Sequence, residues 1–273
     1  MKNRNMLALR SVGLLCCFAT LMNLFGVFAQ TPQEMRRPKM AAPASVGLIE
    51  DLVTAYRILA IQGIFDAYGH VSVRHDRDPN RDLMARSLAP SLVTAADIVE
   101  FDLDSRPVEG NTSTPVVERF IHGEIYKARP DVMAVVHCHP PSVIPFSVSS
   151  VPLRPVFVAA AFIGDGLPLF KTGEIEVSTK MAIQDGARGK ALAQALGDRP
   201  AVLMRGHGAA VVGASVRIAV LHTYHLDMNA KLQAQAILLG GTVSYVAPEP
   251  PGTVIADGGD RAWDFWKRKV NDK

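Results

Sequence analysis

The run of residues 132–139 constrains the fold more than any other part of the chain. It is apolar and rich in valine, which is typical of a buried strand. Pro140 and Pro141 follow it directly. Because proline has no N–H to donate to a sheet, the strand must end there. A buried strand needs cover from other elements, so we expect a sheet packed between outer layers.

Other apolar patterns predict the elements around this strand. Helical spacing, or helix start and stop signals, predict helices over residues 46–62, 114–128, 179–196 and 216–240. Short apolar runs predict strands over residues 70–75, 83–86, 98–103, 201–205 and 209–212. These elements do not alternate as they do in a parallel doubly wound sheet. The sequence therefore predicts an α/β fold over residues 45–273, a three-layer αβα sandwich with a central, mostly antiparallel sheet.

The first 29 residues have the pattern of a secretory signal peptide. Lys2 and Arg4 precede an apolar run over residues 12–28, which ends at the small Ala29, where a signal peptidase would cut. An uncleaved membrane anchor is one alternative, although the run is short for a bilayer span, and a cytoplasmic start is another. We expect residues 1–29 to be a signal peptide and residues 30–44 a flexible linker. The mature protein is then exported, periplasmic or secreted, without stable membrane insertion.

Charge and cysteine content narrow the partners and the chemistry. Three of the 29 basic residues lie in the first 29 positions and no acidic residue does, so 26 basic and 26 acidic residues remain after cleavage. A neutral domain without a basic stripe gives no electrostatic reason to expect a nucleic-acid partner. The mature chain keeps a single cysteine, Cys138, so an internal disulfide cannot form.

Three histidines predict a metal site. His137 and His139 stand two apart at the end of the strand, so both imidazoles project from the same face while Cys138 points the other way. His207 lies between two glycines directly after another apolar strand, where the backbone can turn tightly. Three histidines with one open position make a catalytic zinc site, and manganese and iron also accept imidazole. The alternatives are a chance pair of histidines and a turn histidine bonded to the backbone.

Glu118 is the candidate acid–base residue. It lies near the start of the helix predicted over residues 114–128, and a helix N-terminus favours a carboxylate. If that helix packs beside the histidine strand, Glu118 can reach the open side of the ion and move protons there. The alternative is a solvated glutamate at a helix start. His122, one turn later, is interpreted as a structural hydrogen-bonding residue.

These residues carry a resemblance to a known family. Residues 118–140, ERFIHGEIYKARPDVMAVVHCHP, resemble the central motif of the class II aldolase/adducin family, and residues 203–208, LMRGHG, resemble its third-ligand segment. Gly69 to Arg74 resemble its glycine-started strand at the substrate site. The resemblance implies that His137, His139 and His207 are metal ligands and that Glu118 is the acid–base residue. It also implies a homotetramer with active sites between neighbouring subunits.

The sequence departs from the sugar-phosphate members of that family. Where those members carry small or hydroxyl residues around a phosphate, this chain has Gly69-His70, Ser87-Leu88-Ala89-Pro90 and Val116-Val117. Valine side chains cannot donate hydrogen bonds to an anion. The segments instead resemble those of family members that decarboxylate oxo acids or hydroxylated aromatic acids. We therefore expect a divalent-metal-dependent lyase that decarboxylates a non-phosphorylated oxo or hydroxyaromatic acid.

Three further side chains are candidates for substrate contacts. Arg74 and Arg205 could hold a carboxylate, because guanidinium pairs bidentately with that group, although internal salt bridges would explain them equally well. His70 could add a hydrogen bond to the substrate. Two other functions remain open: an aldolase or epimerase acting on a hydroxy-carbonyl or sugar-phosphate substrate, and a non-enzymatic, adducin-like binding module. A metal-dependent oxygenase is a further alternative.

Overall fold

A computed structural model describes residues 42–108, 112–171, 182–247 and 257–272 of the chain. The predicted signal peptide and most of the predicted linker lie outside these residues. From residue 41 onward the chain forms one compact unit, which contains the whole of the predicted domain. Among the described residues, no helix combines the length and the apolar character needed to cross a bilayer.

A seven-stranded sheet forms the middle of this unit. Its strands are β1 (His70–Arg74), β2 (Arg81–Ala85), β3 (Ile98–Asp102), β4 (Ala134–Cys138), β5 (Leu169–Phe170), β6 (Ala201–Met204) and β7 (Gly208–Gly213). They lie in the order β3-β2-β1-β4-β7-β6-β5. Every pairing is antiparallel except the one between β5 and β6. The prediction of a mostly antiparallel sheet is therefore confirmed, with the histidine strand β4 at its centre.

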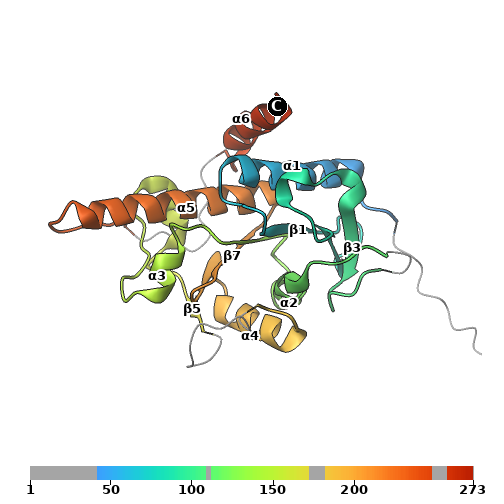
Figure 1. The fold of residues 1–273 in the computed structure, drawn as a ribbon, viewed down its shortest axis with the longest axis horizontal. Coiled ribbons are helices and arrows are strands. Elements are labelled where there is room, and N and C mark those ends of the chain that lie inside the picture. The colour runs from blue at the N-terminus through green and yellow to red at the C-terminus, as the bar shows by residue number, and fades with distance from the viewer. Residues whose placement is uncertain (1–41, 109–111, 172–181, 248–256, 273) are drawn as a thin grey trace, which may run out of the picture. The chain divides into compact units, whose positions relative to one another are not determined.

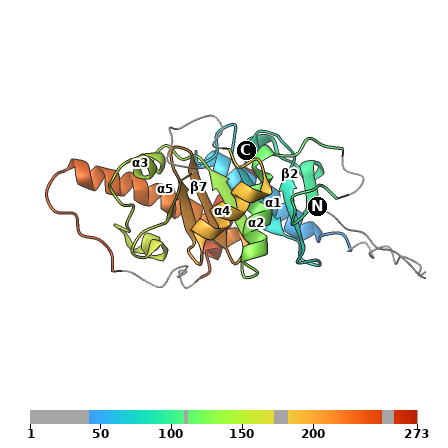
Figure 2. The same cartoon turned by 90° about the horizontal axis from the view of Figure 1, so that it is seen from below.

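Helices cover both faces of the sheet (Figures 1 and 2). One outer layer consists of α1 (Val46–Ile61), α5 (Val216–Leu238) and α6 (Asp260–Asn271), and the other of α2 (Phe120–Ala128) and α4 (Gly186–Leu196). A short helix, α3 (Ile144–Val148), follows β4. Single-turn 3₁₀ helices lie at Pro90–Leu92, Ala95–Asp97 and Val117–Arg119, and a longer one at Val158–Ile163. This is the predicted three-layer arrangement.

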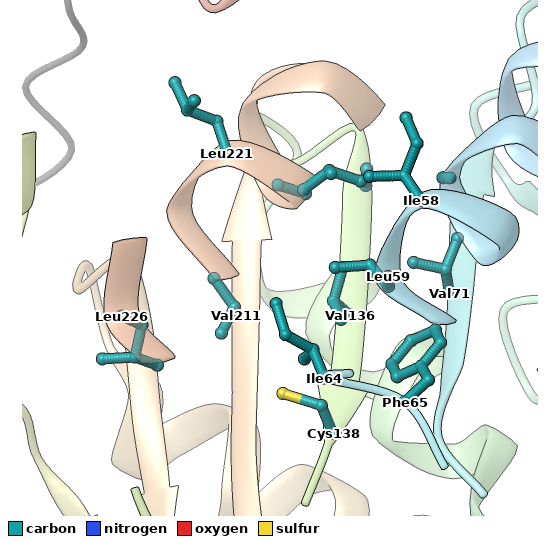
Figure 3. Packing of buried hydrophobic residues seen from close by; sticks show 14 of the residues in the cluster. Ile58, Leu59, Ile64, Phe65, Val71, Val136, Cys138, Val211, Leu221 and Leu226 are labelled. Carbon is teal, nitrogen blue, oxygen red and sulfur yellow. The ribbon is translucent and has the colours of Figure 1, made fainter. Parts of the chain in front are cut away.

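The two faces of β4 pack into different clusters. Val136 and Cys138 contact the larger core between the sheet and α1 and α5, where Figure 3 shows the Cys138 sulfur among aliphatic side chains. Val135, on the opposite face, packs in a second core with residues of α2 and α4. His137 shares that second face. The alternation thus removes Cys138 from any metal site and turns the histidines toward the α2 layer.

Two predicted helices begin later than the sequence pattern indicated. The helix predicted from residue 114 starts at Phe120, because Val116 is extended and Glu118 has φ −87° and ψ 19°, outside the helical region. The helix predicted from residue 179 starts at Gly186, where the Asp185 side chain accepts from the N–H of Arg188 as an N-cap. Residues 179–181 lie outside the described part of the chain.

Candidate metal centre

The structure brings together all four residues of the predicted centre. One ligand atom from each of Glu118, His137, His139 and His207 lies within 4.8 Å of the others. His137 lies in strand β4, and His139 is the first residue after that strand. His207 lies in the turn between β6 and β7. Glu118 comes from the 3₁₀ turn before α2. Because β4 and β7 are hydrogen-bonded neighbours, the sheet itself holds the three histidines near the same end of these two strands.

The hydrogen bonding of His137 fixes which of its nitrogens faces the centre. Its Nδ1 lies 3.1 Å from the carbonyl oxygen of Ala209, an arrangement in which Nδ1–H donates and Nε2 keeps a free lone pair. That Nε2 lies 2.9 Å from Nε2 of His139. Burial, with the charges of His137 and His207, lowers the pKa of His139 to about 4, so its ring is uncharged at neutral pH. Converging imidazole nitrogens beside a carboxylate are a donor set that fits a divalent cation.

Two glycines let the His207 turn approach β4 closely. Gly206 has φ +65°, a left-handed conformation that side chains disfavour. A Cβ on Gly208 would collide with the carbonyl oxygen of Cys138 and lie 3.0 Å from Cδ2 of His139. The rings of His139 and His207 stack with centroids 4.9 Å apart and planes 14° apart. The glycines predicted to permit a tight turn therefore also permit this contact between ligand rings.

Replacing Gly208 with alanine is expected to destabilise the protein by on the order of 3 kcal/mol, because main-chain atoms of β4 would have to move. For a chain of this size that loss lowers the melting temperature by about 10 °C. The measurement is thermal unfolding followed by circular dichroism. Gly47→Ala is the matched control, since a Cβ on that helical glycine meets nothing within 4 Å. Equal melting temperatures for the two variants would contradict the packing described above.

Glu118 is held by two different sets of contacts. Its Oε1 accepts a hydrogen bond from the main-chain N–H of Ile183 at 2.8 Å. Its Oε2 lies 3.2 Å from Nε2 of His137 and 3.5 Å from Nε2 of His207. Burial alone would raise the pKa of this carboxyl, but the two histidines outweigh it and hold the pKa below its ordinary value. Glu118 is therefore an ionised carboxylate, with one oxygen fixed and the other facing the centre.

A cavity of about 590 Å³ opens beside the centre. Glu118 and His139 line it together with His70, and its other walls are mostly apolar or aromatic. Those walls come from residues Ala67, Tyr68, Leu88, Ala89, Val116 and Val117. The segments in which the sequence lacks phosphate donors are thus the cavity walls. A volume of this size and lining suits a small, largely apolar organic molecule with a few oxygen atoms.

His70 lines the cavity, and its contact with a substrate stays a prediction. It pairs with His137 across β1 and β4, and the centroids of the two rings are 5.0 Å apart. Its Nδ1 lies 2.6 Å from Nε2 of His122, which places His122 in a hydrogen-bonding role as predicted. Burial, with the charges of His122 and His137, lowers the pKa of His70 well below its ordinary value. A neutral His70 therefore borders the cavity.

Arg74 contradicts the prediction of a substrate contact. Its guanidinium donates to the main-chain carbonyls of Pro79, Tyr126, Arg129 and Val132, at distances of 2.6 to 3.0 Å. It lies at the other end of β1 from His70 and is buried. Two of these carbonyls belong to the end of α2, where the last turn leaves carbonyls without helical partners. Arg74 therefore caps α2 and holds no substrate.

Arg205 is exposed and follows β6, two residues before His207. Its main-chain N–H donates to the carbonyl of Phe170 at 3.1 Å, and its contact with a substrate stays a prediction. Sequence reasoning did not identify Ile183, whose N–H orients Glu118. No local signal marks a main-chain donor 65 residues away. It also passed over Ser72, although a serine between valines in a buried strand is a signal for a paired polar group.

The chain is similar to known proteins both in sequence and in fold. Residues 50–234 match the family described as the class II aldolase and adducin N-terminal domain. The chain is 32% identical to decarboxylase tropJ of Talaromyces stipitatus, over 85% of this chain and 96% of that protein. It is 33% identical to 3,4-dihydroxyphthalate decarboxylase of Arthrobacter keyseri, over 72% of this chain and 82% of that enzyme.

A solved structure shares the fold. The aldolase II superfamily protein from Pseudomonas syringae superposes with a TM-score of 0.69 and 24% identity, and the match covers 85% of this chain and 94% of that one. The likeness concerns the fold alone. It places the sheet and both helical layers described above in an arrangement already known from experiment.

Proposed function

This chain belongs to the class II aldolase and adducin family, and we propose that it is a divalent-metal-dependent carbon–carbon lyase that decarboxylates a non-phosphorylated oxo or hydroxyaromatic acid. One observation carries the proposal: three imidazoles and a carboxylate meet at the end of a mostly apolar cavity. The decarboxylases to which the chain is similar support the reaction class. An adducin-like assembly module would have no use for this cluster.

We propose zinc as the ion, with manganese and iron as alternatives, held by His137, His139 and His207. Such an ion supplies a Lewis acid that withdraws electrons from the substrate as a carbon–carbon bond breaks. The fixed orientation of the rings is a contribution of the chain itself. His137 is oriented through Ala209, and His139 and His207 through their stacked contact.

The chain also supplies a proton carrier. When the bond to the carboxylate breaks, its electron pair stays on the substrate carbon, carbon dioxide leaves, and a proton must reach that carbon. Oε2 of Glu118 faces the centre, while Oε1 is held by Ile183. Glu118 accepts a substrate hydroxyl proton at Oε2 and returns it to the carbon, and solvent restores the hydroxyl. The apolar cavity walls limit the access of other water.

The same walls argue against a sugar phosphate. Leu88, Val116 and Val117 line the cavity where a phosphate would need hydroxyl or main-chain donors. A dianion placed against these apolar side chains would lose hydration that they cannot replace. An aldolase acting on sugar phosphates is therefore the weaker alternative, although its metal centre would be similar.

A substrate panel tests the proposed reaction. The panel holds 3,4-dihydroxyphthalate, other hydroxylated aromatic acids, oxo acids and L-fuculose 1-phosphate, each with zinc-, manganese- or iron-loaded protein. We expect carbon dioxide release from at least one acid and no cleavage of the sugar phosphate. Chelator-treated protein is the control and should release none. Cleavage of the sugar phosphate alone would make the protein an aldolase, and turnover coupled to oxygen consumption would make it an oxygenase.

We also propose that the protein is a homotetramer whose cavities lie near subunit contacts. The C-terminal end of α5 extends beyond the sheet in Figures 1 and 2. Exposed apolar side chains lie at this end of the helix. Leu238 and Leu239 are 85% and 87% exposed. Apolar side chains at a protruding helix end favour self-association.

The double substitution Leu238→Glu and Leu239→Glu is expected to lower the assembly state, because charged side chains disfavour an apolar contact. Light scattering coupled to gel filtration measures the mass directly, with about four subunits expected for the parent protein. Lys267→Glu, on α6, is a control for added negative charge. An unchanged tetramer in the double variant would place the contact elsewhere, and a monomeric parent protein would overturn the proposal.

We further propose that the protein is exported, on the strength of Lys2, Arg4 and the apolar run over residues 12–28. Mass spectrometry of the N-terminal peptide, after expression of the full chain in a bacterium, tests this. A mature N-terminus at Gln30, in periplasmic or secreted protein, is the expected result. An intact N-terminus in the cytoplasm would overturn it.

A further inference from the structure

Four buried polar side chains, His70, His122, Ser72 and Tyr126, form a hydrogen-bonded relay that runs from the cavity into the layer between β1 and α2. Nδ1 of His70 lies 2.6 Å from Nε2 of His122. Nδ1 of His122 lies 2.6 Å from Oγ of Ser72, and that hydroxyl lies 2.7 Å from the hydroxyl of Tyr126. All four residues are at least 95% buried. The chemistry assigned to Glu118 and the histidine ligands does not use this relay, so the role of the relay needs a separate explanation.

Tyr126, at the far end of the relay, fixes the direction of the hydrogen bonds. Burial raises the pKa of Tyr126 well above its ordinary value, so the phenol keeps its proton. Within the described residues, Oγ of Ser72 is the only side-chain or carbonyl acceptor bonded to that hydroxyl. Tyr126 therefore donates to Ser72. A serine hydroxyl has one proton, and with its oxygen occupied as an acceptor it donates that proton to Nδ1 of His122.

The same direction of hydrogen-bond donation continues through both imidazoles. Burial, with the charge of His137, lowers the pKa of His122 to about 3, so its ring is neutral and carries one proton. Since Nδ1 of His122 accepts from Ser72, that proton is on Nε2, which donates to Nδ1 of His70. Because Nδ1 of His70 accepts this hydrogen bond, it carries no proton, and the ring proton of His70 must be on Nε2. His70 lines the cavity, and Nε2 is the ring nitrogen that does not face His122.

We propose that Tyr126, Ser72 and His122 are positioning residues that lock His70 as its Nε2–H tautomer, so that His70 presents a neutral hydrogen-bond donor to an anionic oxygen of the substrate beside the metal centre. The identity of the oxygen rests on the proposed function: it is the oxygen on which negative charge develops as carbon dioxide leaves. His70 lies beside His137, with ring centroids 5.0 Å apart, and this puts the donor on the same side of the cavity as the ligands. A preorganised donor of this kind stabilises charge that appears only during the reaction.

A locked tautomer has an advantage over a free histidine at this place. With Nδ1–H, the ring would offer a lone pair to the cavity and repel the substrate oxygen. With both nitrogens protonated, it would put a positive charge beside the metal ligands. The relay prevents both of these protonation states without any charged partner, because it ends on a phenol and contains only neutral groups. The site can then hold an anion through a dipole alone.

Nuclear magnetic resonance of the zinc-loaded full-length protein tests the tautomer directly. Long-range ¹H–¹⁵N correlation of ¹⁵N-histidine distinguishes the protonated nitrogen of each ring, and the His70→Gln and His122→Gln variants assign the two signals. We expect protonated Nε2 and unprotonated Nδ1 in both rings. A His70 ring with its proton on Nδ1, or on both nitrogens, would overturn the proposal. This measurement needs no turnover, so it tests the tautomer of His70 whether or not the proposed reaction is correct.

Tyr126→Phe removes the phenol proton that sets the direction, and the Ser72 hydroxyl is then free to accept from His122. The expected result is a mixture of His70 tautomers, seen as nitrogen shifts that move toward intermediate values. Tyr56→Phe is the matched control, because Tyr56 is equally buried and donates to the carbonyl of Val71 at 2.9 Å on the other face of β1. It should leave the shifts unchanged. Identical shifts in all three proteins would remove Tyr126 from the relay.

Two substitutions at His70 separate its donor from its shape. His70→Phe keeps a ring but removes the donor, and we expect kcat to fall by about 100-fold with KM changed much less. His70→Gln places an amide N–H near the position of Nε2 and should recover at least half of that loss on a logarithmic scale. Metal content, measured on the same samples, should stay that of the parent protein. Equal kcat for the parent protein and His70→Phe, or equal losses in both variants, would overturn the donor role.

Discussion

Replacing His139 with alanine abolishes metal binding at neutral pH. The protein without residues 1–29 is expected to hold about one divalent ion per subunit, as a three-histidine site does, and the variant close to none. Two imidazoles do not hold such an ion against dilution once the third is removed, and Glu118 is occupied in part by Ile183. Mass spectrometry with inductively coupled plasma, on dialysed protein, measures the content.

The loss of the ion should remove the activity as well. A Lewis acid contributes several kcal/mol to the stabilisation of developing charge. We therefore expect His139→Ala to lower kcat/KM by on the order of 10³-fold or more. His225→Ala is the matched control, since it removes a half-buried imidazole from α5 that packs on Phe157 outside the cluster. It should keep both the ion and the activity.

Two outcomes would contradict this account in different ways. If the parent protein binds none of zinc, manganese or iron, the lyase proposal fails and an adducin-like binding module becomes the better explanation. If His139→Ala keeps a full equivalent of metal, the ion lies elsewhere and the cluster has another role. The identity of the ion also directs the substrate search. Zinc or manganese favours decarboxylation or aldol cleavage, and iron favours oxygen chemistry.

The ligand histidines could be predicted because their placement depends on short-range rules. Strand alternation is enough to put His137 and His139 on one face and Cys138 on the other, and the structure keeps that arrangement. His207 was recognisable because glycines on both sides permit a turn that few other residues allow. The antiparallel pairing of β4 with β7 then brings the two segments together.

The remaining features depend on contacts between distant segments. The helix before the site appeared to start at Thr114-Pro115, yet Glu118 leaves the helical region while its carboxylate bonds to Ile183 and faces His137. Arg74 seemed available for a substrate because guanidinium pairs bidentately with a carboxylate, although an internal salt bridge would explain it equally well. Two of its four carbonyl partners lie at the end of α2, more than 50 residues away. Local patterns do not report where a helix end needs donors.

Glu118→Gln separates proton transfer from metal binding. The amide oxygen of glutamine can still accept from the N–H of Ile183, so the side chain should stay in place. It cannot carry a proton between the substrate and the carbon that loses carbon dioxide. We expect kcat to fall by about 10²- to 10⁴-fold, the usual contribution of a positioned acid–base group. Steady-state kinetics on the best acid of the panel measure this.

The decisive comparison is the metal content of the same Glu118→Gln samples. The three histidines remain, so the content should match that of the parent protein. Glu124→Gln is the control, because Glu124 lies on α2 and pairs with Lys127 at 2.6 Å, away from the cluster. If Glu118→Gln loses the ion together with activity, Glu118 is a fourth ligand, and its distance of 3.2 Å from His137 reflects shared coordination. If it keeps both, the proton comes from another group, and the cavity residue to test next is the neutral donor His70.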